Sequence, residues 1–372
     1  MNRDYDAIIV GARVAGSITA ALLGALGHKV LLLDRAHFPS DTLSTHFFRS
    51  PALKAFQRMG VFDQVQRAAP HLVKTFTDVE GHTWSDPVEE DDGLDYLMCV
   101  RRITLDTILT GRVQEVSNVE FRQGARFTEL IRENGAVIGA KWRDAAGEYE
   151  ATARVIVGAD GFYSRVAELV EPEVEQFEPV HRAMYYTYFQ GLVPRENPAA
   201  EFYFRGDHLA YVFPTDANRT LVAVSVPISE FEQFRKDAKH EMMSMLESLP
   251  ALAPRLKPAE VVAPVKGAGN IPCYQRVPYG NGWVLAGDSG QVFDPWSGQG
   301  IDHASQHAVI LAEALHDLFE DKKEWGDAMF SYHSLRNSSS RRNFESTRKF
   351  ARDLRRMSHA ALKKRGLKVT QS

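Results

Sequence analysis

The stretch YDAIIVGARVAGSITAALLGALGHKVLLLD, residues 5–34, decides the fold. Its first residues, 5–10, are apolar and β-branched, which predicts a short buried strand. A turn follows, and small residues then predict a helix over 17–26 that leads into a second apolar strand, 29–33. Strand, helix and strand in this order predict a βαβ unit of the kind that binds a dinucleotide.

Single positions in this unit suit phosphates and a ribose. Gly11 permits the tight turn, and Gly16 lets the helix pack close to the strand. The free N–H groups at the helix start, together with the helix dipole, favour a pyrophosphate. Asp34, at the end of the second strand, can accept hydrogen bonds from a ribose. Arg13 replaces the second glycine of the motif, and we expect its guanidinium to turn toward the phosphates. This unit alone does not distinguish FAD from NAD.

Composition limits the class of protein. The chain has 372 residues, enough for two packed domains, and is 44% hydrophobic and 25% charged, as in soluble globular proteins. A net charge of −4 argues against nucleic acid as the main partner. No stretch is apolar enough to span a membrane, and the chain runs straight into its first strand, which argues against a signal peptide. Cys99 and Cys273 form no C-x-x-C pair, so we expect no metal site and a reducing, cytoplasmic location.

The tail is compositionally distinct. Residues 341–368 contain eleven Lys or Arg against two acidic residues. One interpretation is a helix whose apolar stripe packs on the acidic body, and the other is a helix that lies on a membrane surface. We favour packing, because the stripe consists only of Phe344, Phe350 and Leu354. A homodimer formed through this tail is a further interpretation.

Two other regions carry candidate side chains. The polar loop behind the second strand contains His46 and Arg49, and loops of this kind often carry function. Residues 180–228 are rich in strand signals and aromatics, which suits the wall of a pocket for a flat, apolar substrate, although most of these rings will fill a core. An amphipathic helix is expected over 228–249. The acid cluster 89–92 is predicted to be a solvated loop rather than a metal site.

A second strand–turn–helix unit lies near the C-terminal third of the chain. The strand GWVLAGDSG, 282–290, is followed by the turn DPWSGQG, 294–300, and by a long helix, 301–319. The amino end of this helix can face another phosphate or a ring. No second glycine fingerprint precedes a strand that ends in an acid, so we expect one full-length dinucleotide-binding domain.

Taken together, these motifs resemble the single-component FAD-dependent monooxygenases of the para-hydroxybenzoate hydroxylase type, over about residues 5–320. GADGFYSRV, 158–166, is similar to the Asp-Gly motif of that family, and GDSGQVFDPWSGQGID, 287–302, to its Gly-Asp motif followed by P-x-x-G-x-G. DTLSTH, 41–46, and the R-x-x-L-D of 102–106 resemble a subgroup near the geranylgeranyl-reductase-like FAD oxidoreductases.

The resemblance implies an α/β fold. A Rossmann-like FAD-binding domain of the glutathione-reductase type would carry an inserted β-rich α+β substrate domain and C-terminal helices. The expected ranges are 1–75, 98–175 and 265–320 for the discontinuous FAD-binding domain, 76–97 and 176–264 for the substrate domain, and 321–372 for the helical tail.

The resemblance also implies site residues. Arg102 would reach the pyrophosphate or ribityl region, Asp288 a ribityl hydroxyl, and the loop 295–300 with Ile301 the isoalloxazine ring. Asp160 would link the FAD region to transient nicotinamide binding. The whole cofactor-binding set is Gly11, Arg13, Val14, Ala15, Gly16, Asp34, Arg35, Leu43, Arg102, Asp160, Gly287, Asp288, Gly298, Gly300 and Ile301.

The implied catalytic candidates are His46, Arg49 and Pro295. Arg49 falls where the family often has an arginine near the flavin and the phosphate of the nicotinamide nucleotide. His46 and His303 are acid–base candidates, but neither has a visible partner in the sequence, so we favour a structural histidine for both. Asp302 departs from the family, which often has Asn there. An acid near the flavin would disfavour anionic reduced flavin unless the acid is paired or turned away.

The implied function is a monooxygenase. NADH or NADPH would reduce the flavin, and O2 would then form a flavin hydroperoxide that oxygenates an aromatic or polyketide-like small molecule. The nearest alternative is an oxygen-independent FAD-dependent reductase or dehydrogenase of the geranylgeranyl-reductase type. A flavin-dependent halogenase is disfavoured because the sequence has no W-x-W-x-I-P segment. A non-catalytic, escort-type binding protein is disfavoured by the retained acids of the motifs.

Overall fold

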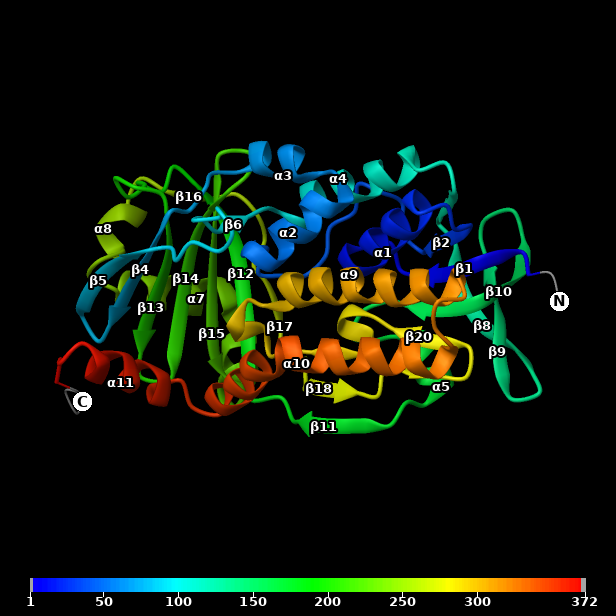
Figure 1. Ribbon diagram of the computed structural model, residues 1–372. Coiled ribbons are helices and arrows are strands. Elements are labelled where there is room, and N and C mark those ends of the chain that lie inside the picture. The colour runs from blue at the N-terminus through cyan, green and yellow to red at the C-terminus, as the bar shows by residue number, and fades with distance from the viewer. Residues whose placement is uncertain (1–2, 369–372) are drawn as a thin grey trace.

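The structure, a computed structural model, describes residues 3–368 (Figure 1). Residues 1, 2 and 369–372, which end two of the expected domain ranges, lie outside it. The predicted βαβ unit is present as β1 (Tyr5–Val10), α1 (Val14–Ala25) and β2 (Val30–Asp34). α1 begins at Val14, earlier than expected, because the backbone of Gly11 has a φ of +103° and turns the chain at once.

The first sheet extends this unit in both directions. Its main path contains five neighbouring strands that run parallel, with Ala7 of β1 opposite Val155 on one side and Val30 on the other. The ends of such strands form the crevice in which open α/β sheets bind ligands. In order, the path is β19 (Tyr279–Gly280), β20 (Trp283–Leu285), β10 (Glu148–Gly158), β1, β2 and β7 (Val119–Gln123), and β8 (Arg126–Glu133) and β9 (Ala136–Arg143) continue antiparallel from β10.

A second, mostly antiparallel sheet lies at the other end of the molecule (Figure 1). One short strand, β17 (Lys266–Ala268), pairs with β12 in this sheet, although the expected ranges assign 265–320 to the FAD-binding domain. The main path is β16 (Glu260–Val261), β12 (Arg182–Gln190), β15 (Arg219–Pro227), β14 (His208–Thr215), β13 (Ala199–Arg205), β4 (Lys74–Val79) and β5 (His82–Pro87).

Smaller pairings complete the strand structure. β3 (Phe47–Phe48) pairs with β6 (Met98–Cys99). β11 (Val174–Glu178), β18 (Cys273–Arg276) and β21 (Gln291–Val292) form a three-stranded sheet. Both cysteines, Cys99 and Cys273, are buried free thiols.

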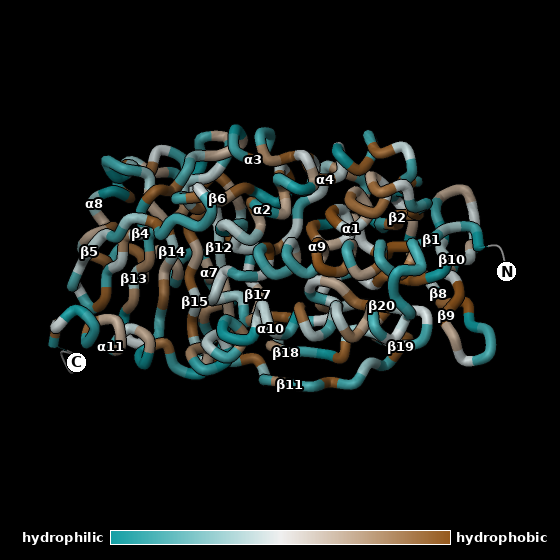
Figure 2. The backbone as a smooth tube through the Cα atoms, viewed as in Figure 1, coloured by the Kyte–Doolittle hydropathy of each residue, from teal (hydrophilic) through white to brown (hydrophobic). Residues whose placement is uncertain are grey.

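Helices cover the first sheet and connect it to the second. α1, α2 (Ser50–Met59) and α9 (Gly300–Phe319) pack together, and α10 (Trp325–Ala351) lies beside α9 (Figure 1). Hydrophobic residues gather where α1 and α9 meet (Figure 2). Other helices are α3 (Phe62–Ala68), α4 (Arg102–Glu115), α5 (Arg165–Val170) and α11 (Arg355–Lys364). None of the helices between residues 3 and 368 combines the length and the apolar character needed to cross a bilayer.

The basic tail packs on the body, as expected. Phe344 and Leu354 are buried, and Arg352 forms an ion pair with Glu178 of β11, with 2.7 Å between Nη2 and Oε1. α11 reaches the second sheet, where Arg365 pairs with Asp86 of β5. The tail is therefore held by apolar burial and by carboxylates of the chain itself.

The amphipathic helix expected over 228–249 is broken. The segment forms η1 (Ile228–Glu230), α6 (Phe231–Phe234), η2 (Arg235–Asp237) and α7 (Ala238–Glu247), and α8 (Ala253–Leu256) follows. The prediction of one helix is wrong because Asp237 is an N-cap. Its side chain accepts the N–H of His240, and its backbone leaves the helical region at φ −145° and ψ 70°.

The aromatic strands divide between two cores because successive side chains of a strand point to opposite faces. Tyr185 of β12 stacks on Phe234 in the core beneath α6 and α7. Tyr186 and Tyr188 lie on the other face, in a cluster with Phe47 and Trp296. Only this second face is turned toward the loop that precedes α9.

Candidate cofactor and substrate site

Close backbone packing leaves no room for a side chain at the glycines of the first motif. A Cβ at Gly11 would lie 2.3 Å from the carbonyl oxygen of Ala159, and one at Gly16 would lie 1.7 Å from the carbonyl oxygen of Gly11. The N–H groups of Val14 and Ala15, in the first turn of α1, have no acceptor in the described part of the chain. The turn thus presents free donors at the positive end of a helix dipole, which suits a pyrophosphate.

Asp34 lies at the edge of this turn. Its Oδ2 accepts the N–H of Ala12 at 2.7 Å, and its Oδ1 accepts the N–H of Ala36 at 2.8 Å. These bonds fix the carboxylate, and each oxygen retains a lone pair for a ribose hydroxyl. Arg35 and Leu43, also expected near the cofactor, are exposed in the segment that follows β2.

Arg13 and Arg102 share one buried carboxylate. Arg102 Nη2 lies 2.8 Å from Asp106 Oδ1, and Arg13 pairs with Oδ2 of the same residue. Arg13 also donates to the carbonyl oxygen of Asp41 at 3.2 Å. Its side chain is 27% exposed, so the guanidinium can still receive an anion. Two cations around one carboxylate leave a net positive charge next to the start of α1.

Asp288 offers a carboxylate without a protein partner. It follows Gly287, which has a φ of +60° and whose added Cβ would lie 3.0 Å from Ala15, so the turn sits against the start of α1. Tyr274 donates to the backbone oxygen of Asp288, but no donor among residues 3–368 reaches its carboxylate. Burial raises the pKa of Asp288 to about 6, against an opposing effect of Arg102. A partly buried, unpaired carboxylate here suits a ribityl hydroxyl.

The carboxylate of Asp160 accepts hydrogen bonds from residues of the turn that follows it. Its carboxylate accepts the hydroxyl of Ser164 at 2.5 Å and the N–H of Arg165 at 2.7 Å, at the start of α5. Burial raises the pKa of Asp160, and these hydrogen bonds oppose the effect. These bonds hold the carboxylate of Asp160 in place and shape the second motif.

The loop before α9 is held from two sides. Tyr211 of β14 donates to the carbonyl oxygen of Trp296, and Trp296 Nε1 donates to the carbonyl oxygen of Thr347 on α10 at 3.1 Å. Pro295 begins the short 3₁₀ turn that contains Trp296, and Gly298 ends it with a φ of +62°. This loop therefore has a fixed position between the second sheet and α10.

The start of α9 provides a second set of free donors. The N–H groups of Gly300 and Ile301 have no acceptor among residues 3–368, and a Cβ at Gly300 would meet open space. Open space beside two N–H groups at a helix start suits a carbonyl-bearing ring.

Arg49 and Asp302 form an ion pair that joins α2 to α9. Asp302 is 3% exposed, and it accepts the backbone N–H of Arg49 at 2.7 Å and its Nη1 at 3.0 Å. Burial raises the pKa of Asp302, and the guanidinium opposes this. The acid that departs from the family is thus paired. Arg49 also approaches the carbonyl oxygen of Gly298 at 3.4 Å, and its side chain remains 34% exposed.

The contacts of His46 suit a structural histidine better than an acid–base group. It is fully buried with a φ of +58°. Its Nδ1 accepts the N–H of Arg102 at 3.2 Å, so neutral His46 carries its proton on Nε2, which lies 2.7 Å from the hydroxyl of Tyr188. Burial lowers the pKa of His46 to about 3. His46 therefore stays neutral and positions Tyr188 and the start of α4.

His303 is also unsuited to acid–base work. Its ring stacks on Phe293 with 4.1 Å between centroids, and Nε2 lies 3.0 Å from Gln299 Oε1. Burial lowers the pKa of His303 to about 3.

Tyr186 is a candidate that sequence reasoning did not single out. Its hydroxyl is buried without a hydrogen-bond partner in the described part of the chain, and its ring meets His46 edge to face. Side chains alternate along the strand MYYTYFQ, so the pattern indicates which residues share a face of the sheet with Tyr186. A buried phenol proton without an acceptor is an available donor for a ligand or water.

A cavity of about 390 Å³ lies beside Phe47 and Arg49, two residues that contact the loop. Phe47 and Arg49 line it on the cofactor side, and a Cβ at Gly298 would lie 3.5 Å from the ring of Phe47. This volume is within the range of small-molecule sites. The lining residues are Phe47, Arg49, Ser50, Thr75, Asp86, Pro87, Val88, Glu89, Leu94, Tyr96, Leu97 and Phe202.

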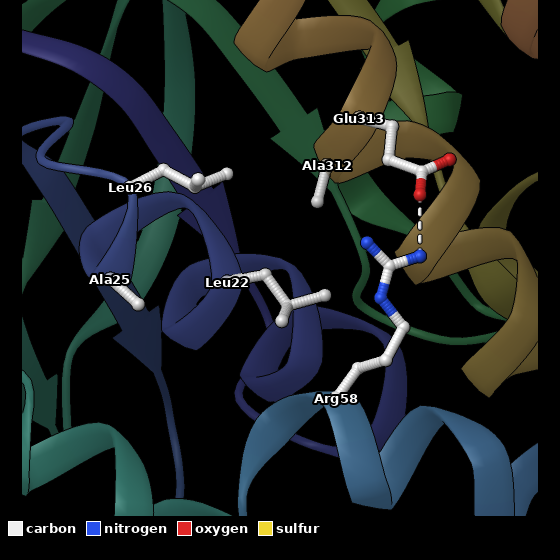
Figure 3. Close-up of a pocket in the computed structure, with 6 residues that line it drawn as sticks. All are labelled: Leu22, Ala25, Leu26, Arg58, Ala312 and Glu313. Atoms are coloured by element: carbon white, nitrogen blue, oxygen red, sulfur yellow. Dashed lines mark hydrogen bonds and ion pairs between the residues drawn. The ribbon is translucent and has the colours of Figure 1, made fainter.

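A second hollow, of about 250 Å³, lies away from these motifs (Figure 3). It is a groove between Leu22 and Leu26 of the α1 region and Ala312 of α9, and an ion pair between Arg58 and Glu313 crosses it. Its lining is mainly aliphatic and contains no group of the cofactor motifs.

Comparison with known proteins agrees with the cofactor that these residues suit. The family described as "FAD binding domain" matches residues 4–346. Digeranylgeranylglycerophospholipid reductase 2 of Methanococcoides burtonii is 26% identical over 331 residues, which cover 84% of this chain and 75% of that protein. The 1H-pyrrole-2-carbonyl-[peptidyl-carrier protein] brominase of Pseudoalteromonas luteoviolacea is 21% identical over 348 residues, which cover 90% of this chain and 82% of that protein.

Solved structures share the fold. PqsL, a probable FAD-dependent monooxygenase from Pseudomonas aeruginosa, superposes with a TM-score of 0.81 at 21% identity, over 93% of this chain and 95% of that one. The myxobacterial chondrochloren halogenase CndH superposes with a TM-score of 0.83 at 20% identity, over 92% and 81% of the two chains.

Proposed function

Because the chain belongs to the FAD binding domain family and is an FAD-dependent oxidoreductase, we propose that it is a monooxygenase of the para-hydroxybenzoate hydroxylase type. In this proposal NADH or NADPH and O2 serve to oxygenate an aromatic or polyketide-like small molecule. When bound, FAD would supply the redox chemistry, which is the transfer of electrons from the nicotinamide to O2. Both cysteines are buried free thiols, which favours a cytoplasmic location.

The chain's own residues would bind and orient the cofactor. The free N–H groups at the start of α1, with Arg13 and Arg102, would neutralise the pyrophosphate, and Asp34 would hold the ribose. Asp288 would accept a ribityl hydroxyl. The N–H groups of Gly300 and Ile301 would face the ring, and the Arg49–Asp302 pair would keep the loop 294–300 in place for it.

The observation that carries the proposal is the cavity beside this loop. Its walls include Phe47, Tyr96 and Phe202, so a flat ring can bury its faces there. The loop next to it is held in place by Tyr211 of the second sheet and by Thr347 of α10, which bond to Trp296. Arg49 lies where the cavity meets the loop, so substrate bound there would lie next to the ring of the cofactor.

Labelled oxygen tests the proposal. The FAD-loaded protein is reduced anaerobically with NADH or NADPH in the presence of a panel of phenols and aromatic ketones, and ¹⁸O₂ is then admitted. The expected result is a product with one ¹⁸O atom and little hydrogen peroxide. A product without label, or peroxide equal to the NAD(P)H consumed with every compound, would contradict oxygen insertion.

A second candidate is an oxygen-independent reductase of carbon–carbon double bonds. The observations in its favour are the DTLSTH stretch and the curated relatives named digeranylgeranylglycerophospholipid reductases. Product formation by the reduced protein in the absence of O2 would select it. A halogenase, suggested by the relative named as a brominase, would instead require a halide for turnover. A protein that stays colourless when FAD is added would favour the escort-type reading.

A further inference from the structure

Two histidines and a glutamate gather at the end of the sheet opposite the cofactor motifs. His28 lies in the turn between α1 and β2, and His316 and Glu320 lie at the C-terminal end of α9. His28 Nε2 and His316 Nδ1 are 2.9 Å apart. Each of the three side chains offers one ligand atom, and these atoms lie within 4.8 Å of one another.

The local structure holds these groups in place. His28 is 6% exposed, and its ring meets Phe319 edge to face with 5.1 Å between centroids. His316 and Glu320 are four residues apart and so share one side of the α9 terminus. The C-terminal end of a helix also favours a cation.

We propose that His28, His316 and Glu320 bind a divalent transition-metal ion such as Zn²⁺, with water as a further ligand. Two imidazole nitrogens and a carboxylate are a ligand set that zinc accepts. Zinc–nitrogen bonds of about 2.0–2.1 Å in a tetrahedral site place the two nitrogens about 3.3–3.4 Å apart. The rings therefore need to separate only slightly from the 2.9 Å of the ion-free pair.

A proton on His316 competes with the metal, and nearby charged groups decide where that proton lies. Lys322 Nζ lies 3.3 Å from His316 Nε2, and an ammonium there keeps the ring proton on Nδ1, between the two histidines. Metal binding requires this proton to leave Nδ1. Arg154 also opposes a cation near His28, whereas Asp6 and Glu320 favour one. Since Lys322 is exposed, its side chain can turn away, and its removal should strengthen metal binding.

The site would fasten the two helices that face the cofactor. α1 and α9 pack along each other, and their amino ends provide the free N–H groups described above. A metal at His28 and His316 would join the opposite ends of this pair. The groove of Figure 3, lined by Leu26 and Ala312, runs beside the same helix ends.

Zinc titration of the tag-free, FAD-loaded protein by calorimetry tests the site. We expect one Zn²⁺ per chain, at least tenfold weaker binding in His316→Ala, weaker binding in Glu320→Gln and tighter binding in Lys322→Ala. His240→Ala, which removes an exposed histidine of α7, is the matched control and should bind as the wild type does. The wild type should also unfold at a higher temperature with Zn²⁺, and His316→Ala should not.

Three results would overturn the proposal. These are no saturable binding by the wild type, unchanged affinity in His316→Ala, or an equal loss of affinity in His240→Ala. Cobalt gives a separate readout, because Co²⁺ at this site should develop visible absorption bands that zinc abolishes. All arms are independent of substrate and turnover, so they separate this site from the proposed oxygenase activity.

Discussion

Replacing Arg49 by methionine leaves the carboxylate of Asp302 buried without its cation. Asp302 is 3% exposed, and Arg49 supplies two of its hydrogen bonds, at 2.7 Å from the backbone and 3.0 Å from the guanidinium. The substitution removes only the second, because the backbone N–H remains. Removing one partner of a buried pair costs about 3–5 kcal/mol. Since the Arg49 side chain is 34% exposed, water can replace part of the contact, and we expect a loss of about 2–3 kcal/mol.

The loss should depend on pH in a defined direction. Burial raises the pKa of Asp302 in the folded protein, and Arg49 opposes this. Without Arg49 the folded-state pKa rises further, so the folded state binds the proton more tightly than the unfolded state does. The folded state then loses stability as pH rises through that pKa. Arg49→Met should therefore be more destabilising at pH 8 than at pH 5.

Urea unfolding of the FAD-free protein, with wild type and variants at both pH values, measures this. Asp302→Asn removes the charge, so Arg49→Met should cost less and lose its pH dependence in that background. Arg235→Met, which breaks an exposed pair with Glu232, is the control and should change stability by less than about 0.5 kcal/mol. Equal costs for Arg49→Met and Arg235→Met, or a larger cost at pH 5 than at pH 8, would refute the reasoning.

Three further predictions concern single groups of the site. Gly16→Ala should abolish FAD binding in a flavin-fluorescence titration, because its Cβ would lie 1.7 Å from a carbonyl oxygen; Gly326→Ala, whose Cβ meets nothing within 4 Å, should bind FAD normally. Tyr186→Phe should leave the melting temperature unchanged or raise it, since its hydroxyl has no partner in the described part of the chain, whereas Tyr203→Phe should lower it by breaking the bond to Glu201. FAD affinity should fall as pH drops through about 6, where the Asp288 carboxylate takes up a proton, and Asp288→Asn should bind more weakly at pH 8 and lack this fall. A wild-type affinity that is flat between pH 5 and 8 would contradict the role of Asp288.

Local sequence signals predicted the elements that depend on neighbours in the chain. The βαβ unit and the long helix expected over 301–319 follow from periodicity and glycines, and both are present. The prediction of one helix over 228–249 is wrong because it followed the apolar periodicity and overlooked a capping residue, Asp237, in the middle of the pattern.

Contacts between distant residues could not be predicted in this way. Arg49 and Asp302 are 253 positions apart, and nothing local indicates that the acid of one motif is paired by the loop of another. His46 depends on Tyr188 and on the N–H of Arg102, so its neutral, structural state becomes visible only when three segments meet. Which tyrosine of β12 faces the cofactor loop is likewise decided by the packing of the second sheet.

The central claim is that one FAD lies across the start of α1, the carboxylate of Asp288 and the loop 294–300. A crystal structure of the FAD-loaded protein tests this most directly. The claim predicts the pyrophosphate at the N–H groups of Val14 and Ala15, a ribityl hydroxyl on Asp288, and the isoalloxazine ring within hydrogen-bond distance of the N–H groups of Gly300 or Ile301. A ring bound elsewhere, or a different nucleotide at the start of α1, would contradict it.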